Sequence, residues 1–253
     1  MRELILKKLN ELEDRENVRI LLAVESGSRA WGFASPDSDY DVRFIYVRNR
    51  DDYLRLEPYR DVIELPIEGD LDINGWDLCK ALRLLRKSNP TLFEWFSSPI
   101  VYLETPFAEE FRQFMLQYFS SKRGLSHYLS MAASNYREYL KGETVKAKKY
   151  FYVLRPVLAC QWILDRGTPP PMLFSELAEA ELPPELQPHV DRLLDLKMNS
   201  PEIKTIPMVE PINLYLDTMI GEVRERIMKM PEGTYHSWEE LDRFFLSQLQ
   251  CGI

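Results

Sequence analysis

Three aspartates alternate along one short stretch of the chain, at Asp37, Asp39 and Asp41, which follows the apolar run 18–24 and leads into the run 41–47. A strand side chain returns to the same face at every second residue, so Asp39 and Asp41 point the same way if an extended segment begins here. Neighbouring carboxylates repel one another, and a divalent metal ion is their natural counter-charge. The stretch therefore predicts a metal site at the start of a strand.

The position of the carboxylates separates the classes of metal site that use such aspartates. A calcium loop of the helix-loop-helix type needs Gly at its sixth and Glu at its twelfth position, and counting from Asp37 these places hold Val42 and Arg48. Phosphatases and sugar transferases with an Asp-x-Asp pair carry it at the end of a strand, whereas here the apolar run follows it. The remaining arrangement is a pair at the start of a strand, preceded by another strand and a Gly-Ser turn.

The turn Gly27-Ser28 indicates that this arrangement binds a phosphate. Glycine lets backbone N–H groups approach a phosphate, and the Ser28 hydroxyl and a helix N-terminus can complete the cradle. Two metal ions about 4 Å apart can then clamp the attacking and leaving oxygens of an in-line displacement. A purely structural acidic turn would account for Asp37 and Ser38, but it leaves the Gly-Ser turn and its spacing to Asp39 unexplained.

The segment "GSRAWGFASPDSDYD" resembles the signature of the DNA polymerase β-like nucleotidyltransferases, which has Gly-Ser, then Ala and Gly, then Ser-Asp-x-Asp before a strand. In this chain the matching positions are Gly27, Ser28, Ala30, Gly32, Ser38, Asp39 and Asp41. Further segments, "DLDINGWDL", "KSNPTLFEW", "SSPIVY" and "KKYFYVLRP", look like the RlaP/YcgL family of predicted nucleotidyltransferases. This similarity spans roughly residues 20–175.

The resemblance implies transfer of a nucleotidyl group from a nucleoside triphosphate (NTP) to a hydroxyl, with release of pyrophosphate. It implies Mg²⁺ or Mn²⁺ held by Asp39, Asp41 and a third carboxylate on a neighbouring strand. Asp72, inside "LDINGW", fits the family pattern best, with Asp70 as a competitor. Asp77 stands where a helix begins and reads as a capping residue.

Nucleotide-binding residues are expected from both halves of the chain. The Gly27-Ser28 turn is expected to bind the phosphates, and Arg29 to face either a phosphate or Asp37; the resemblance adds Ser38. The helical half would add Lys149 and Tyr150, close to Lys146 and Arg155 on one helix, although a solvated basic face explains the same pattern. Trp31 is interpreted as a packing residue rather than a platform for a base.

The expected architecture is α+β: a polymerase β-like nucleotidyltransferase domain with a small mixed sheet, followed by an all-α C-terminal domain. Helical periodicity covers 2–14, apolar or alternating runs predict strands at 18–24, 41–47 and within 61–73, and helices follow from residues 77 and 90. Almost everything after Pro106 has helical periodicity, with a clear loop at 165–171. The predicted domains are 1–105 and 106–253, with the active cleft between them.

The composition limits the classes of protein, partner and cellular location that we expect for this chain. An apolar fraction of 45% with 28% charged residues in 253 residues is that of a globular protein, and the net charge of −8 argues against a general polyanion binder. Cys79, Cys160 and Cys251 are too widely spaced for a disulfide framework or zinc cage, and read as ordinary thiols. No apolar run is long enough to span a bilayer, and 1–17 lacks a signal-peptide core, which predicts a cytoplasmic protein without a membrane segment.

Three classes of function are consistent with these residues. An enzyme would transfer a nucleotidyl group to an RNA end, a protein side chain or a small molecule. An NTP-binding sensor or antitoxin-like module on the same fold would bind or modify a partner protein. A purely structural partner protein is disfavoured, because the Gly-Ser and Asp-x-Asp elements are intact.

Overall fold

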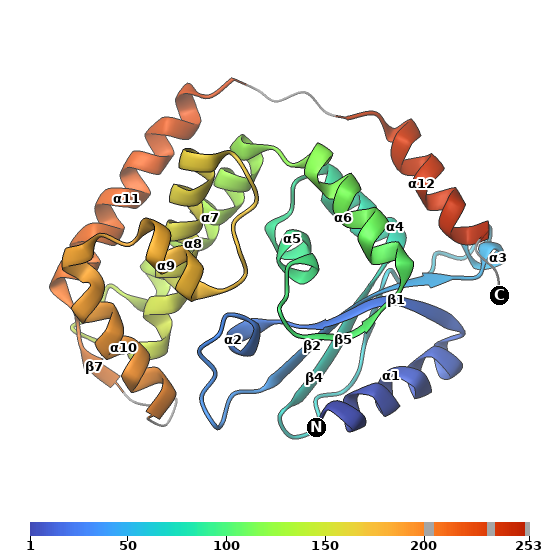
Figure 1. Ribbon diagram of the computed structural model, residues 1–253, viewed down its shortest axis with the longest axis horizontal. Coiled ribbons are helices and arrows are strands. Elements are labelled where there is room, and N and C mark those ends of the chain that lie inside the picture. Colours follow the sequence, from blue (N-terminus) through green and yellow to red (C-terminus); the bar gives the residue numbers. More distant parts are fainter. Residues whose placement is uncertain (200–204, 232–235, 251–253) are drawn as a thin grey trace. The chain divides into compact units, whose positions relative to one another are not determined.

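The computed structural model describes residues 1–199, 205–231 and 236–250, and the chain divides into two compact units. The sheet unit comprises Met1–Gly27, Asp39–Tyr118 and the chain from Thr234, and the helical unit comprises Ser28–Ser38 and Phe119–Gly233. Figure 1 shows a sheet flanked by helices in the first unit and a group of helices in the second. Each unit is described by itself below.

A five-stranded mixed sheet forms the centre of the sheet unit, in the order β3-β4-β2-β1-β5. Its strands are β1 (Val18–Glu25), β2 (Tyr40–Arg48), β3 (Val62–Glu64), β4 (Leu71–Asp77) and β5 (Val101–Glu104). Only β2 and β4 run parallel, and the other neighbours are antiparallel. The mixed sheet expected from the sequence is confirmed.

Helices cover both faces of this sheet (Figure 1). On one face lies α1 (Arg2–Glu16), whose side chains Ile5, Leu9 and Leu12 are buried in the same cluster as residues of β2 and β4. Gly75 of β4 leaves room for the ring of Phe44, which a Cβ at this position would hit. On the other face lie α4 (Leu78–Arg86), α5 (Pro90–Phe96), α6 (Pro106–Tyr118) and α12 (Trp238–Gln250), and the single turn α3 (Arg50–Tyr53) follows β2.

The helical unit is built around α8, which is buried along most of its length. Its elements are α7 (Ser121–Tyr139), α8 (Ala147–Arg166), α9 (Phe174–Glu181), the 3₁₀ turn η1 (Pro184–Leu186), α10 (Gln187–Asn199) and α11 (Glu210–Lys229). A short ribbon of β6 (Thr144–Lys146) and β7 (Thr205–Pro207) accompanies these helices. An α-helical C-terminal part is confirmed, with this ribbon as an addition.

The segment 28–38 is part of the helical unit, although it follows β1 in the chain. The ring of Phe33 is 4.8 Å from that of Phe151 and 5.5 Å from that of Phe174, and the Phe174 N–H donates to the Trp31 carbonyl at 3.0 Å. Apolar burial therefore anchors this loop on the helices. Its two flanks, Gly27 and Asp39, belong to the sheet unit.

The predicted elements are largely confirmed, and the omissions are short. Helix 2–14 and the strands at 18–24 and 41–47 exist, and 61–73 contains β3 and the start of β4. Strand β5 and the β6/β7 ribbon were not predicted. The compact units divide the chain elsewhere than the predicted domains 1–105 and 106–253, since α6 and α12 group with the sheet and 28–38 groups with the helices.

Two further expectations concern the membrane and the cysteines. None of the helices in the described part of the chain is both long and apolar enough to cross a membrane. Cys79 and Cys160 are free thiols, as predicted, and burial raises the pKa of the Cys79 thiol to about 11. Cys251 lies outside the described residues.

Candidate active site

Asp41 and Asp72 lie side by side on the two parallel strands of the sheet. The register pairs Asp41 of β2 with Asp72 of β4, and one guanidinium nitrogen joins them: Arg43 Nη2 donates to Asp41 Oδ1 at 2.9 Å and to Asp72 Oδ2 at 2.7 Å. All three side chains are about one-fifth to one-third exposed. The structure thus assembles two carboxylates that are 31 residues apart in the chain.

Asp39 and Asp70 precede the two parallel strands. Both are exposed, and the Asp70 carbonyl accepts the Tyr40 N–H at 2.6 Å. Asp39 stands two residues before Asp41, at the spacing that shares a face in extended chain. The register with Asp41 and the shared arginine favour Asp72 over Asp70 as the third carboxylate of the group.

The Gly-Ser turn passes directly over Asp41. Gly27 has φ +60°, and a Cβ there would collide with Oδ2 of the Asp41 carboxylate. The neighbouring Ser26 N–H donates to the Asp41 carbonyl at 2.8 Å. Only glycine combines this conformation with this close approach, so the turn and the carboxylate are built as one local structure.

A buried carboxylate fixes the backbone of the same region. Glu25, at the end of β1, is fully buried, and its Oε1 accepts the Asp41 N–H at 2.6 Å. Its Oε2 accepts the hydroxyl proton of Tyr102, and its carbonyl accepts the Ser98 hydroxyl at 2.6 Å. Three segments of the sheet unit therefore meet at Glu25 and hold Asp41 in place.

A serine–lysine cluster, formed by Ser28, Ser35, Ser38 and Lys197, holds the loop 28–38 within the helical unit. The Ser38 hydroxyl lies 3.1 Å from that of Ser28 and 2.9 Å from that of Ser35. Lys197 of α10, almost completely buried, donates to Ser35 Oγ at 2.9 Å and to Ser38 Oγ at 3.3 Å. Arg29 donates to the Ser38 carbonyl at 2.7 Å, which ties both ends of the loop together.

The structure places the predicted residues of α8 differently from the sequence interpretation. Tyr150 is fully buried, its hydroxyl donates to Asn213 Oδ1 at 2.7 Å, and it accepts the Val209 N–H at 2.7 Å. Arg155 is almost fully buried and donates to the Met172 carbonyl at 3.3 Å. Side chains without exposed surface cannot contact a nucleotide, so both are assigned to the core of the helical unit.

Lys149 is half-buried on the surface of α8. Its ammonium lies 3.7 Å from the ring centroid of Tyr139 and 4.6 Å from that of Tyr152, which are cation–π contacts. Its predicted contact with the nucleotide stays a prediction. Trp31 packs against Tyr152 and lies under Arg155, in agreement with its interpretation as a packing residue.

Asp77 caps a helix, as its position in the sequence indicated. It is fully buried at the start of α4, accepts the Cys79 N–H at 2.8 Å and accepts the Tyr53 hydroxyl at 2.9 Å. Burial raises the pKa of this carboxyl from its ordinary value of 3.8 to about 6. Since β4 pairs Asp77 with Tyr46, it lies at the opposite end of the strand from Asp72.

The donor set suits a hard divalent cation. Carboxylate oxygens are the ligands that Mg²⁺ and Mn²⁺ prefer, and Asp41 and Asp72 offer them from two rigid strands. Within the described ranges, no group of three or more His, Cys, Asp or Glu side chains is close enough to hold a metal ion. Arg43 provides the positive charge between the two carboxylates instead.

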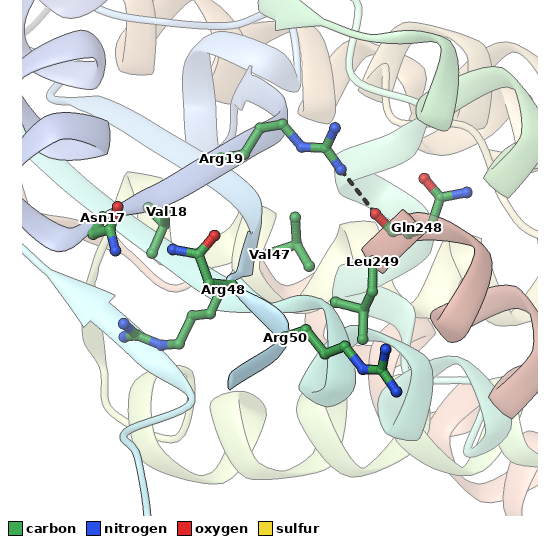
Figure 2. A pocket seen from close by; sticks show the side chains of 9 residues that line it. Asn17, Val18, Arg19, Val47, Arg48, Arg50, Gln248 and Leu249 are labelled. Carbon is green, nitrogen blue, oxygen red and sulfur yellow. Dashed lines mark hydrogen bonds between the residues drawn. The ribbon is translucent and has the colours of Figure 1, made fainter. Parts of the chain in front are cut away.

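A pocket of about 200 Å³ lies at the far end of the same sheet, where β1 begins and β2 ends. Figure 2 shows the arginines that line it. Arg19 donates to the Gln248 carbonyl at 2.9 Å, and Arg50 extends beside Leu249. The Arg48 guanidinium points away from Gln248 and Leu249. The strands carry Asp41 and Asp72 at their other ends, so this pocket is separate from the carboxylate pair.

Three residues that contact the predicted site residues were not predicted themselves. Arg43 had a readable signal, since it stands two residues after Asp41 on the same strand face. Glu25 lies just beyond the predicted strand 18–24, and no local pattern marks it. Lys197 is 159 residues away from Ser38, and only the tertiary structure brings them together.

Comparison with known proteins shows the family to which the chain belongs. The chain is 45% identical to the uncharacterized protein YcgL of Bacillus subtilis (strain 168), covering 99% of this chain and 97% of the relative. A crystal structure of a nucleotidyltransferase-like protein from Exiguobacterium sibiricum 255-15 aligns over 87% of this chain and 73% of its own, at 11% identity. Its TM-score of 0.32 is too low to carry an argument. A model of the RNA repair pathway DNA polymerase beta family (RlaP) matches residues 1–247, and the chain belongs to this family.

Proposed function

We propose that this protein is a metal-dependent nucleotidyltransferase that joins a nucleotidyl group from an NTP to a hydroxyl at an RNA end. The observation that carries the proposal is the pairing of Asp41 with Asp72 on adjacent parallel strands, with the Gly27 turn against the first of them. Family membership supports the reaction class, and the family's name, which refers to RNA repair, supports the acceptor.

The proposed reaction is an in-line displacement at the α-phosphorus. The acceptor oxygen forms a bond to the α-phosphorus, the bond from that phosphorus to the bridging oxygen breaks, and pyrophosphate leaves with both electrons of that bond. The hydroxyl proton passes to solvent or to a neighbouring carboxylate. Mg²⁺ or Mn²⁺ held by Asp39, Asp41 and Asp72 would neutralise the charge that develops on the phosphate oxygens.

The chain's own residues divide the remaining work. Gly27 lies against Asp41 in the sheet unit, and in the helical unit the half-buried Ser28 hydroxyl donates to the buried Ser38 hydroxyl. Lys197 holds these hydroxyls in place through Ser38. Within the helical unit the Ser28 hydroxyl is thus held in one orientation before a phosphate arrives, which limits the entropy lost on binding.

A transfer assay tests the proposal. The protein is incubated with Mg²⁺, a panel of RNAs with free terminal hydroxyls and each of the four NTPs labelled in the α-phosphate. We expect label in the RNA with the parent protein, and none when the label is in the γ-phosphate. Asp41→Asn should remove transfer, whereas the matched variant Asp51→Asn, which changes an exposed aspartate of α3, should retain it.

The same experiment separates the alternative function. Calorimetric binding of NTP in Mg²⁺ without label transfer to any RNA would favour the NTP-binding sensor or antitoxin-like module. Transfer of label to an added protein instead of RNA would keep the enzyme and change its acceptor. Absence of both binding and transfer would refute the proposal.

Calorimetry also tests the phosphate contacts. Lys197→Met should weaken NTP binding, because the Ser38 and Ser35 hydroxyls lose their shared donor. Lys149→Ala should weaken it by about 1–3 kcal/mol if the ammonium leaves the tyrosine rings for a phosphate, as the sequence interpretation holds. Equal affinity of Lys149→Ala and parent would leave Lys149 as a packing residue between α7 and α8.

A further inference from the structure

Arg43 occupies the place between the two site carboxylates. Its Nη2 reaches one oxygen of Asp41 and one of Asp72, and its Nη1 donates to the Val42 carbonyl at 3.1 Å and to the Asp72 carbonyl at 3.2 Å. Four contacts thus hold a single guanidinium against the strands. Its side chain is only 18% exposed, so the contacts are shielded from water on most sides.

The sheet geometry favours a cation at this position. Neighbouring strands are about 4.8 Å apart, so two ionised carboxylates in register repel each other unless a positive charge lies between them. The guanidinium supplies one charge, and its hydrogen bonds are charge-assisted. Arg43 is therefore an internal counter-ion of Asp41 and Asp72.

A divalent cation would need the same oxygens. It would approach them to about 2.1 Å and add two positive charges within a few ångströms of the guanidinium. The other oxygen of Asp41, Oδ2, lies against the Gly27 turn, which leaves little freedom to rotate the carboxylate away from Arg43. Metal and Arg43 therefore compete for one pair of carboxylates.

We propose that Arg43 is a resident counter-ion that assembles Asp41 and Asp72 in the metal-free protein and gives way when a divalent cation binds. This inference rests on the proposed function, and it adds a cost to metal binding that the carboxylates alone would not impose. Metal alone binds weakly, and a metal ion that arrives with the negative charge of an NTP binds more tightly. The order of loading is set by the protein's own arginine.

Titration of Mn²⁺ without NTP tests the competition directly. The bound metal is measured by calorimetry and by loss of the free Mn²⁺ electron paramagnetic resonance signal. Arg43→Gln, which keeps a hydrogen-bond donor without charge, should bind Mn²⁺ at least tenfold more tightly than the parent. Arg60→Gln is the matched control, since Arg60 pairs with Glu64 on the exposed edge strand of the same sheet.

Thermal unfolding supplies a readout that is independent of transfer. Without metal, Arg43→Gln should melt below the parent, because the carboxylates then repel, and saturating Mn²⁺ should raise its melting temperature more than that of the parent. Arg43→Lys keeps the charge and should bind Mn²⁺ close to the parent affinity. If Arg43→Gln fails to fold without metal, recovery of its folded circular dichroism spectrum in Mn²⁺ replaces the melting comparison.

Equal or weaker Mn²⁺ binding by folded Arg43→Gln would overturn the inference and make Arg43 a support of the metal site. Failure of Arg43→Gln to recover its fold in Mn²⁺ would overturn it as well. These results leave the proposed function intact if Asp41→Asn still abolishes transfer. Absence of Mn²⁺ binding by every protein, with and without NTP, would refute both the inference and the proposed function.

Discussion

The two ends of the β2–β4 ladder place aspartates in opposite situations. At one end Asp41 and Asp72 are partly exposed and share the Arg43 guanidinium. At the other end Asp77 is fully buried, caps α4 and accepts the Tyr53 hydroxyl. One end presents charge to its surroundings, whereas the other uses the same residue type to close a helix.

The difference shows how one strand can carry both chemistry and stability. A capping aspartate is fixed by local backbone donors, and burial of its negative charge destabilises the folded state. The paired aspartates share the Arg43 guanidinium, and their side chains are about one-third exposed. Substitutions at the two ends should therefore separate loss of transfer from loss of stability.

The largest effect should follow Asp39→Asn at the exposed end. Loss of one of the proposed metal ligands should lower transfer on the order of 100-fold or more. Asp39 is exposed, so the free energy of unfolding should change by no more than about 0.5 kcal/mol. The transfer assay and urea denaturation measure the two quantities, and full activity of this variant would break the two-metal assignment.

Asp77→Asn should change how stability depends on pH. Burial raises the folded pKa of Asp77 from 3.8 to about 6, so the folded protein holds this proton more tightly than the unfolded chain. Its contribution is fully present below pH 4, and it is lost as the pH rises from about 4 to 6. As the pH rises from 4 to 7, the free energy of unfolding of the variant should therefore increase by about 2–3 kcal/mol relative to that of the parent.

Denaturation of parent and Asp77→Asn at several pH values measures this difference. Other titrating groups are common to both proteins and cancel in the comparison. Transfer activity at pH 7 should be close to that of the parent, because the substitution is at the far end of the ladder from Asp72. A difference that stays constant from pH 4 to 7 would contradict a raised pKa of Asp77.

Gly27→Ala should cost more than a glycine substitution with the same backbone angle elsewhere. Gly27 and Gly69 both have φ +60°, but a Cβ at Gly69 meets nothing within 4 Å, whereas one at Gly27 meets the Asp41 carboxylate. Gly69→Ala should lower the free energy of unfolding by about 1 kcal/mol, the cost of holding an alanine at positive φ. Gly27→Ala should lose about 1–2 kcal/mol beyond that and should also lower transfer.

Unfolding of the two alanine variants by heat in a calorimeter, or by denaturant, measures the two losses of stability. Equal losses of stability with unchanged transfer would mean that the turn does not press on Asp41.

Tyr53→Phe should produce the smallest effect of the series. The hydroxyl donates to Asp77 at 2.9 Å and accepts the Arg48 N–H at 3.0 Å, so its removal should destabilise the fold by about 1–2 kcal/mol. Transfer should be unchanged. A double-mutant cycle with Asp77→Asn should show coupling between the two residues, and additive losses would show that they act independently.

The sequence predicted the strands at the exposed end of the ladder because their signals are local. Alternation marked the strand that carries Asp41, and the Gly-Ser turn marked the approach to it. Asp72 came from the family pattern, and the observed register brings it next to Asp41. The helix-capping role of Asp77 followed from its place before an apolar helix.

The errors lie where burial depends on distant segments. Tyr150 was expected to contact the nucleotide on the basis of the resemblance, and helical periodicity cannot tell which face is covered when α8 is buried almost all round. Lys197 was missed because no sequence pattern connects α10 with the loop 28–38. Strand β5 and the β6/β7 ribbon have only three or four residues each, too few for alternation to be recognised.

The most direct test of the account is a crystal structure of the protein with Mn²⁺ and an NTP analogue that cannot be cleaved between the α- and β-phosphates. We expect an anomalous peak about 2.1–2.2 Å from carboxylate oxygens of both Asp41 and Asp72, with the Arg43 guanidinium withdrawn from between them. A fully bound analogue with Mn²⁺ placed elsewhere, and Arg43 still joining the two aspartates, would contradict it.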